Sequence, residues 1–347
     1  MPSIREELET LERQMFDPMA AFADKSKGRK LSEDLDPIRT CYMRDRDRII
    51  HSKSFRRLKH KTQVFISKDN DHFRTRLTHT LEVNQIAKTV GKALRLNLDL
   101  IEAIALGHDV GHTPFAHTGE EVLNSLLPGG FKHNENSIRV LTIIEQGSLG
   151  PGLNLSSEVL DGILLHSGFG NKQNKAQTLE GQIVHFADKI AYVQHDIDDS
   201  IRAGVLAFDD LPREIIKVLG KTHGERISSL VNDLVRNSKK NMLEGLPEIG
   251  LTSEIEEALQ ELRRFMFKAV YKGPFCQEQR QGAAHIVKYL FCEYCLKPEK
   301  MPEFYREIVS KEGIERGVAD YISGMTDNFC IDRFKKSVLP YECAEDL

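Results

Sequence analysis

The spacing of apolar positions predicts a chain built almost entirely of helices. Between residues 78 and 98, one side of the predicted helix carries four residues at helical offsets: His79, Val83, Ile86 and Val90. A second apolar stripe begins after Asp99, which can cap a helix, and runs directly into His108. No series of alternating positions is long enough to build a sheet, so the predicted fold class is all-α.

Two more helices are expected further along the chain. Thr113 followed by Pro114 is typical of an N-cap and a first helical position, and this helix would extend to about Leu126. A long helix is expected over residues 180–202, with three polar residues spaced by four on one face: Asp188, Tyr192 and Asp196. A carboxylate among apolar neighbours needs a cation or a hydrogen-bond partner, which makes this face a candidate site.

The chain divides into three predicted regions. Residues 1–40 form an N-terminal arm, with an amphipathic start and a polar stretch over residues 24–30 that we expect to be peripheral and partly disordered. Residues 41–205 hold the chemical motifs and form the predicted core. Residues 206–347 show helical periodicity without a comparable motif, and we expect a helical C-terminal region that packs on the core and contacts other subunits.

Composition narrows the class of protein. The 347 residues carry a net charge of −4, so no overall basic excess indicates nucleic-acid binding. Six cysteines are too few for a disulfide scaffold. We see neither a signal peptide nor an apolar run that could span a bilayer, and we expect a reduced, cytoplasmic protein with no membrane partner. Cys292 and Cys295 form a single CxxC, for which ordinary buried thiols are favoured over a structural zinc site.

Residues 44–61 are densely basic, and apolar residues lie between the charges at helical offsets. Such a run is usually the solvated face of a helix. Its position just before the histidine-rich part of the chain also suits a surface that faces a polyanion. Both interpretations stay open at this point.

Eleven of the 13 histidines lie between His51 and His195, so this part of the chain needs imidazole groups. His108 and Asp109 are immediate neighbours, and neighbours on a helix point about 100° apart. They reach one ion most easily where a helix ends, and Gly111 is a stop signal. Imidazole with carboxylate suits a divalent transition metal or magnesium.

The order His79, His108-Asp109, Asp188 resembles that of the HD phosphohydrolase superfamily. Six segments are similar to its dGTPase-like branch, the dNTP triphosphohydrolases: residues 48–63, 76–79, 108–120, 133–134, 187–192 and 320–327. The resemblance covers roughly residues 36–335. It implies an all-α protein with an HD-domain helical core and a helical C-terminal extension.

The resemblance also implies an activity and a site. One divalent metal ion (Mn, Mg or Fe) would be held by four ligands: His79, His108, Asp109 and Asp188. Water would attack the α-phosphorus of a deoxynucleoside triphosphate, which releases deoxynucleoside and inorganic triphosphate. His117 would serve as acid or base, Glu120 would orient it, and His133 would lie on the phosphate side.

Five further residues match substrate contacts in that branch. Gln63 and Arg76 would contact the sugar and α-phosphate side, and Lys189 a phosphate. The Tyr192 ring would form a wall under the deoxyribose, where it would exclude a 2′-hydroxyl. Asp196 would accept a hydrogen bond from the 3′-hydroxyl.

Two alternatives remain. An HD-type phosphodiesterase or nucleotidase with a binuclear site would use extra histidines that lie between His108 and Asp188: His112, His117, His133 and His166. A nucleic-acid-binding regulatory protein with a vestigial HD site would use the basic run over residues 44–61. The resemblance also brings in single-stranded DNA or an allosteric dNTP as partners, and a homo-oligomeric assembly.

Overall fold

The computed structural model describes residues 2–63, 73–168 and 175–339, apart from the side chains of residues 274–276. Its α-helices are α1 Ile4–Met15, α2 Cys41–Ile50, α3 Lys53–Arg57, α4 Arg76–Ala93, α5 Leu98–Gly107, α6 Ala116–Leu126, α7 His133–Arg139, α8 Ser157–Leu165, α9 Leu179–Arg202, α10 Arg213–Leu219, α11 His223–Leu243, α12 Ser253–Met266, α13 Pro274–Leu296, α14 Glu303–Glu312, α15 Ile314–Ser323 and α16 Asp327–Val338.

The remaining elements are short. Two π-helical turns extend α7 and α12 (η3 Val140–Ile144 and η5 Phe267–Tyr271), and four 3₁₀ turns lie in connections: η1 Ala23–Lys25, η2 Leu58–His60, η4 Phe208–Asp210 and η6 Pro298–Lys300. In the described residues the strands β1 Gln146–Gly147 and β2 Gly150–Pro151 form one antiparallel pair. The all-α prediction is confirmed.

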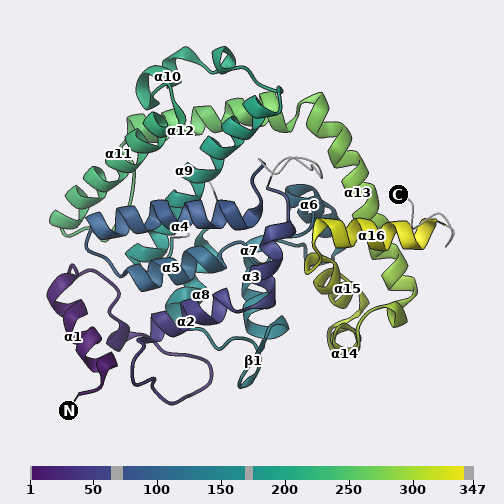
Figure 1. Ribbon diagram of the computed structural model, residues 1–347, viewed down its shortest axis with the longest axis horizontal. Helices are drawn as coiled ribbons and strands as arrows, with labels where there is room; N and C mark the ends of the chain where they lie inside the picture. Colours follow the sequence, from purple (N-terminus) through teal and green to yellow (C-terminus); the bar gives the residue numbers. More distant parts are fainter. Residues whose placement is uncertain (1, 64–72, 169–174, 340–347) are drawn as a thin grey trace.

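The main hydrophobic core forms around α4, α5, α8 and α9. Figure 1 shows α4 running across the middle of the molecule, with α5 and α8 on one side of it and α10, α11 and α12 on the other. Residues of α5 and α9 are fully buried, among them Leu100, Ile104 and Ile190. The end of α5, which carries His108, is therefore fixed inside the protein.

A second hydrophobic core joins α6 to α13, α15 and α16, which appear together on the right in Figure 1. Leu123, Val287 and Ile322 are fully buried in it. The first core continues through α10–α12 as far as Val270. Apolar packing is thus continuous across residue 205, and the division of the chain there stays a prediction.

Two helix starts differ from the sequence prediction. Asn97, not Asp99, caps α5, because its side-chain oxygen accepts the backbone N–H groups of Asp99 and Leu100 at 3.1 and 3.2 Å. Helix α6 begins at Ala116 rather than at Pro114, since Phe115 adopts a left-handed conformation with φ 59°.

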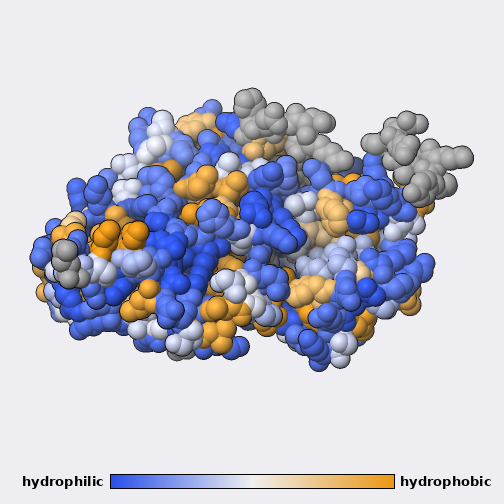
Figure 2. Space-filling view, turned by 60° about the horizontal axis from the view of Figure 1, so that its bottom comes forward, coloured by the Kyte–Doolittle hydropathy of each residue, from blue (hydrophilic) through white to orange (hydrophobic). Residues whose placement is uncertain are grey.

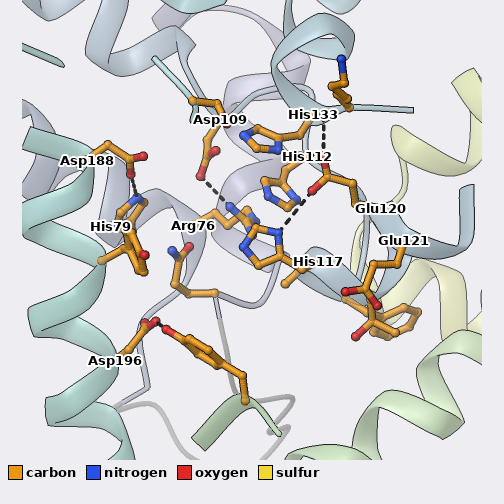
Figure 3. A pocket seen from close by; sticks show the side chains of 18 of the residues that line it. Arg76, His79, Asp109, His112, His117, Glu120, Glu121, His133, Asp188 and Asp196 are labelled. Atoms are coloured by element: carbon orange, nitrogen blue, oxygen red, sulfur yellow. Dashed lines mark hydrogen bonds and ion pairs between the residues drawn. The ribbon is translucent and has the colours of Figure 1, made fainter. Parts of the chain in front are cut away.

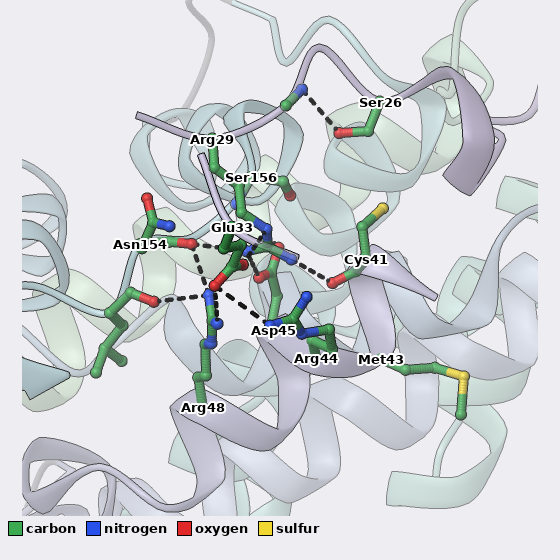
Figure 4. A network of polar contacts seen from close by, with 12 residues as sticks. Ser26, Arg29, Glu33, Cys41, Met43, Arg44, Asp45, Arg48, Asn154 and Ser156 are labelled. Atoms are coloured by element: carbon green, nitrogen blue, oxygen red, sulfur yellow. Dashed lines mark hydrogen bonds and ion pairs between the residues drawn. The ribbon is translucent and has the colours of Figure 1, made fainter. Parts of the chain in front are cut away.

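The N-terminal segment packs on the core, although we expected a peripheral and partly disordered arm. Glu180 of α9 accepts a hydrogen bond from the backbone N–H of Ala21 at 3.0 Å, and Glu158 of α8 accepts one from Lys27 at 2.7 Å. Figure 4 shows that Arg29 lies among polar groups at the start of α2, where it contacts the fully buried Asp45. Residues of the polar stretch thus interact with buried or partly buried carboxylates of α2 and α8.

Several arginines of the basic run over residues 44–61 form ion pairs with acidic residues of the same chain. Arg44 and Arg48 both contact Glu33, at 3.2 and 2.6 Å (Figure 4), and Arg46 contacts Asp99 at 2.9 Å. Lys61 is buried. These cations face inward to partners within the protein, which favours a structural interpretation of the run.

The surface has a mixed character. On the face in Figure 2, apolar and hydrophilic side chains are interspersed, and no single apolar band covers it. None of the helices in the described part of the chain combines the length and apolar character needed to span a bilayer.

Candidate active site

One pocket of about 590 Å³ brings the predicted site residues together. It lies between α4, α6, α7 and α9 and is closed on one side by η5 and α13 (Figure 3). The predicted site residues that line it are Gln63, Arg76, His79, Asp109, His117, Glu120, His133, Asp188, Lys189, Tyr192 and Asp196. His108 is fully buried behind this lining. A volume of this size suits a small-molecule substrate.

The four predicted metal ligands converge from three places in the sequence. His79 Nε2 lies 3.1 Å from Asp188 Oδ1, and His108 Nε2 lies 3.8 Å from the same oxygen and 3.7 Å from Asp109 Oδ2. Ligand atoms of His79, His108 and Asp109 all lie within 4.8 Å of one another. Neighbouring ligands of one ion at about 2.1 Å are roughly 3 to 3.5 Å apart, so a small inward adjustment would suffice.

His108 supplies an independent test of whether these residues fit a metal. Its Nδ1 donates to the backbone carbonyl of Ala105 at 2.6 Å, which leaves a lone pair on Nε2. That Nε2 is buried and has no hydrogen-bond partner among the described residues. An unpaired buried acceptor is costly, and a metal ion satisfies it, so the donor set fits a divalent cation.

Both carboxylates of this group are held ionised. Burial acts to raise the pKa of Asp109, but the neighbouring Arg76 and His108 bring it well below its usual value. Burial likewise opposes ionisation of Asp188, whose pKa the neighbouring His79 and His108 nevertheless lower. Arg76 Nη1 donates to Asp109 Oδ2 at 2.6 Å, so the predicted substrate contact also touches a candidate ligand.

Glu120 holds two histidines at the opposite end of the pocket (Figure 3). Its Oε2 lies 3.2 Å from His117 Nδ1, and its Oε1 lies 2.9 Å from His133 Nδ1. The His117 side chain is 73% exposed, so its ring is available to a bound molecule. Burial disfavours the imidazolium of His133, but the bond to Glu120 outweighs it and raises the pKa of His133.

Replacing Glu120 with Gln is expected to lower the pKa of His133. The variant removes the carboxylate that stabilises the imidazolium, while burial continues to favour the neutral ring. The His133 ring would then lose its proton at a lower pH than in the wild type. An NMR titration of the histidine ring protons measures this shift, with Glu121→Gln as a control one residue away. An unchanged pKa of His133 would show that Glu120 is not the group that raises it.

The C-terminal region supplies five pocket residues that sequence reasoning missed: Arg263, Phe267, Tyr271, Gln279 and Arg280. Two of them form hydrogen bonds to predicted site residues. The Tyr271 hydroxyl donates to Asp196, and Arg263 Nε donates to the Tyr192 hydroxyl at 2.7 Å. Burial raises the pKa of Asp196 well above its usual value, and nearby Asp199 adds to the effect. Residues 249–336 carry no motif that reveals these contacts, which depend on how α12 packs against α9.

The C-terminal helices also hold the loop between α5 and α6. Asp327 accepts the backbone N–H of Phe115 at 3.0 Å and that of Thr62 at 2.9 Å. Lys61 Nζ donates to the carbonyl oxygens of Ser323, at 2.8 Å, and of His112. These bonds fix the loop over residues 111–115, on which the His112 ring and the start of α6 depend.

A helical core that gathers two histidines and two aspartates, from the start of α4, the end of α5 and the interior of α9, defines an HD-domain phosphohydrolase. Residues 76–193 match the HD domain family, and residues 249–336 match the phosphohydrolase-associated domain.

The chain belongs to the deoxyguanosinetriphosphate triphosphohydrolase-like family. It is 58% identical to the protein of that name from Clostridium tetani, over 97% of both chains. The Clostridium perfringens strain 13 relative is 56% identical, over 97% of this chain and 98% of its own. A relative from Caldanaerobacter subterraneus subsp. tengcongensis is 52% identical, over 97% and 96% respectively.

Proposed function

We propose that the protein hydrolyses deoxynucleoside triphosphates to deoxynucleoside and inorganic triphosphate with the help of one divalent metal ion. The observation that carries the proposal is the buried His108 Nε2, unpaired among the described residues and beside His79, Asp109 and Asp188. Family membership supports the substrate class, because the relatives are named for deoxyguanosine triphosphate.

The four residues His79, His108, Asp109 and Asp188 would hold the ion. When bound, a divalent ion makes water more acidic and neutralises phosphate oxygens. Arg76 and Lys189 both line the pocket and would orient the phosphates by charge. Burial lowers the pKa of Lys189 to about 8, so its ammonium form prevails at neutral pH.

The departing 5′-oxygen of the sugar needs a proton, and the Glu120 cluster can supply one. His117 is exposed to the pocket, while its Nδ1 is held by Glu120, so Nε2 faces outward to donate or accept. His133 shares the same carboxylate and adds positive charge on the phosphate side.

Replacing Tyr192 with Ala is expected to reduce the preference for dNTPs over NTPs about tenfold or more in kcat/KM. The ring forms part of the wall beside Asp196, and its removal would open space for a 2′-hydroxyl. Tyr192→Phe is the matched control, since it keeps the ring and removes the hydroxyl that accepts the bond from Arg263. An unchanged dNTP-to-NTP ratio in the Ala variant would contradict this role.

Product analysis tests the proposed function. The protein is incubated with Mn²⁺ or Mg²⁺ and each of the four dNTPs, singly and mixed, and triphosphate, pyrophosphate and orthophosphate are resolved. We expect intact triphosphate and deoxynucleoside in equal amounts. Release of pyrophosphate or orthophosphate, or no release from any dNTP, would refute cleavage of the bond between the α-phosphorus and the 5′-oxygen.

A binuclear phosphodiesterase or nucleotidase is the second candidate. It is favoured by a further group of ligand atoms, from Asp109, His112 and His133, that lie within 4.8 Å of one another. Metal analysis of the loaded protein separates the two: one ion per chain supports the triphosphohydrolase, two support the binuclear enzyme. Single-stranded DNA, an allosteric dNTP and a homo-oligomer remain predictions from family resemblance.

A further inference from the structure

We propose that His195 and Glu82 are positioning residues that set the tautomer of His79 and thereby the metal affinity of the site. The inference rests on the proposed metal centre, and it concerns two residues outside the predicted ligand set. His195 lies on α9 seven residues after Asp188, and Glu82 lies on α4 three residues after His79. Both spacings place each pair on one face of its helix.

The contacts form a chain that leads away from the candidate metal centre. His79 Nε2 points to Asp188 Oδ1 at 3.1 Å, while its Nδ1 faces His195 Nδ1 at 3.5 Å. On the far side of that ring, His195 Nε2 lies 3.1 Å from Glu82 Oε2. The two imidazoles meet edge to face, with centroids 5.7 Å apart and planes at 87°.

Only one placement of protons satisfies this chain when His79 is a metal ligand. A ligating Nε2 must present its lone pair, so the His79 proton resides on Nδ1 and needs an acceptor. His195 is buried, and a neutral ring there can accept at Nδ1 only if its own proton is on Nε2. Glu82 accepts that second proton, which fixes both tautomers.

His108, the other candidate histidine ligand, donates its Nδ1 proton to a backbone carbonyl instead of to a side chain. His108 Nδ1 donates to the carbonyl of Ala105 at 2.6 Å, three residues earlier. His79 lies in the first turn of α4, and its Nδ1 turns to a side chain of α9 instead. His195 therefore does for His79 what the Ala105 carbonyl does for His108.

The far end of the chain is anchored by charge. Arg74 Nε donates to both carboxylate oxygens of Glu82 at 3.2 Å, and its Nη1 donates to Asp199 at 2.8 Å. The ring of His223 stacks on that of His195, with centroids 6.0 Å apart and planes at 19°. Glu82 is thereby held in place, and the His195 ring is confined between α4 and α11.

Substitutions of His195 can separate its two contacts. Asn places an amide oxygen near the position of Nδ1 and keeps the acceptor for His79, whereas Gln reaches toward Nε2 and keeps the contact with Glu82. Phe keeps the ring shape and removes both contacts. His223→Phe is the control, because it changes the neighbouring imidazole outside the chain of hydrogen bonds.

Isothermal titration with Mn²⁺ tests the proposal on the full-length chain. We expect His195→Gln and His195→Phe to weaken Mn²⁺ binding by about 10- to 100-fold, as loss of an outer hydrogen-bond partner does. His195→Asn and His223→Phe should bind within a few-fold of the wild type. With saturating Mn²⁺, kcat of the Gln variant should return close to the wild-type value, since His195 touches no substrate.

Equal Mn²⁺ affinity in the wild type and in the Gln and Phe variants would overturn the inference and leave the metal centre standing. A wild-type chain that takes up no Mn²⁺ would overturn the metal centre and the inference together. If the Phe variant fails to fold, the Asn and Gln pair decides, because a purely structural role would weaken thermal stability without the Asn-over-Gln order in metal affinity.

Discussion

The Asp188→Asn variant is expected to lose dNTP hydrolysis by a factor on the order of 10³ or more. Asp188 Oδ1 lies within 4 Å of the Nε2 atoms of both His79 and His108, at 3.1 and 3.8 Å. The amide has the same shape but no negative charge, so two imidazoles and one carboxylate would remain to hold a divalent ion. Steady-state kinetics with titrated Mn²⁺ measures the loss.

Asp198→Asn is the matched control for this experiment. It removes the same charge from the same helix, but its side chain contacts Arg74 at 3.4 Å and does not line the pocket. Activity close to wild type is expected. A comparable loss in both variants would attribute the effect to α9 as a whole, and near-normal activity of Asp188→Asn would refute its role as a ligand.

The Asp45→Ala variant is expected to destabilise the protein by about 3–5 kcal/mol, since it breaks the buried pair with Arg29 and leaves the buried N–H of Ser156 without its acceptor. Arg29 would keep its contact with Glu33 at 2.9 Å. Asp45 is fully buried, contacts Arg29, and accepts the backbone N–H of Ser156 at 2.9 Å (Figure 4). The change would detach the N-terminal segment and the start of α8 from α2. Thermal unfolding, followed by circular dichroism, measures the loss.

Two comparisons separate the buried pair from surface charge. Glu214→Ala breaks the exposed pair with Lys217 and should cost less than about 1 kcal/mol. The double variant Arg29→Met/Asp45→Leu removes both charges and should be more stable than Asp45→Ala alone. Equal melting temperatures for Asp45→Ala and Glu214→Ala would contradict the assigned role of Arg29 and Asp45.

Much of the candidate site could be predicted from the sequence, because its residues occupy positions that helical periodicity and helix-end signals reveal. His79 belongs to a helical stripe and the His108-Asp109 pair to a helix end, and Asp188, Tyr192 and Asp196 share one face of α9. Resemblance to a family assigns their roles, which remain to be tested. The prediction of an all-α fold succeeds for the same reason, since periodicity is read within each helix.

Contacts between distant segments could not be predicted in this way. The Thr113-Pro114 signature favours an earlier start for α6, but Asp327 takes the backbone N–H of Phe115, and the chain turns through a left-handed residue instead. Arg263 and Tyr271 reach the pocket only because α12 packs against α9. No pattern of neighbouring residues in the sequence predicts these contacts between distant helices.

The bonds from Asp327 and Lys61 have a consequence for how the chain could be cut or exchanged. A fragment that ends near residue 205 would keep the histidines and aspartates but lose the acceptor for Phe115 and the Ser323 carbonyl that anchors Lys61. The HD segment transferred alone into another protein would therefore lack contacts that hold the loop over residues 111–115. We expect a correctly formed pocket only in a chain that contains both matched segments, residues 76–193 and 249–336.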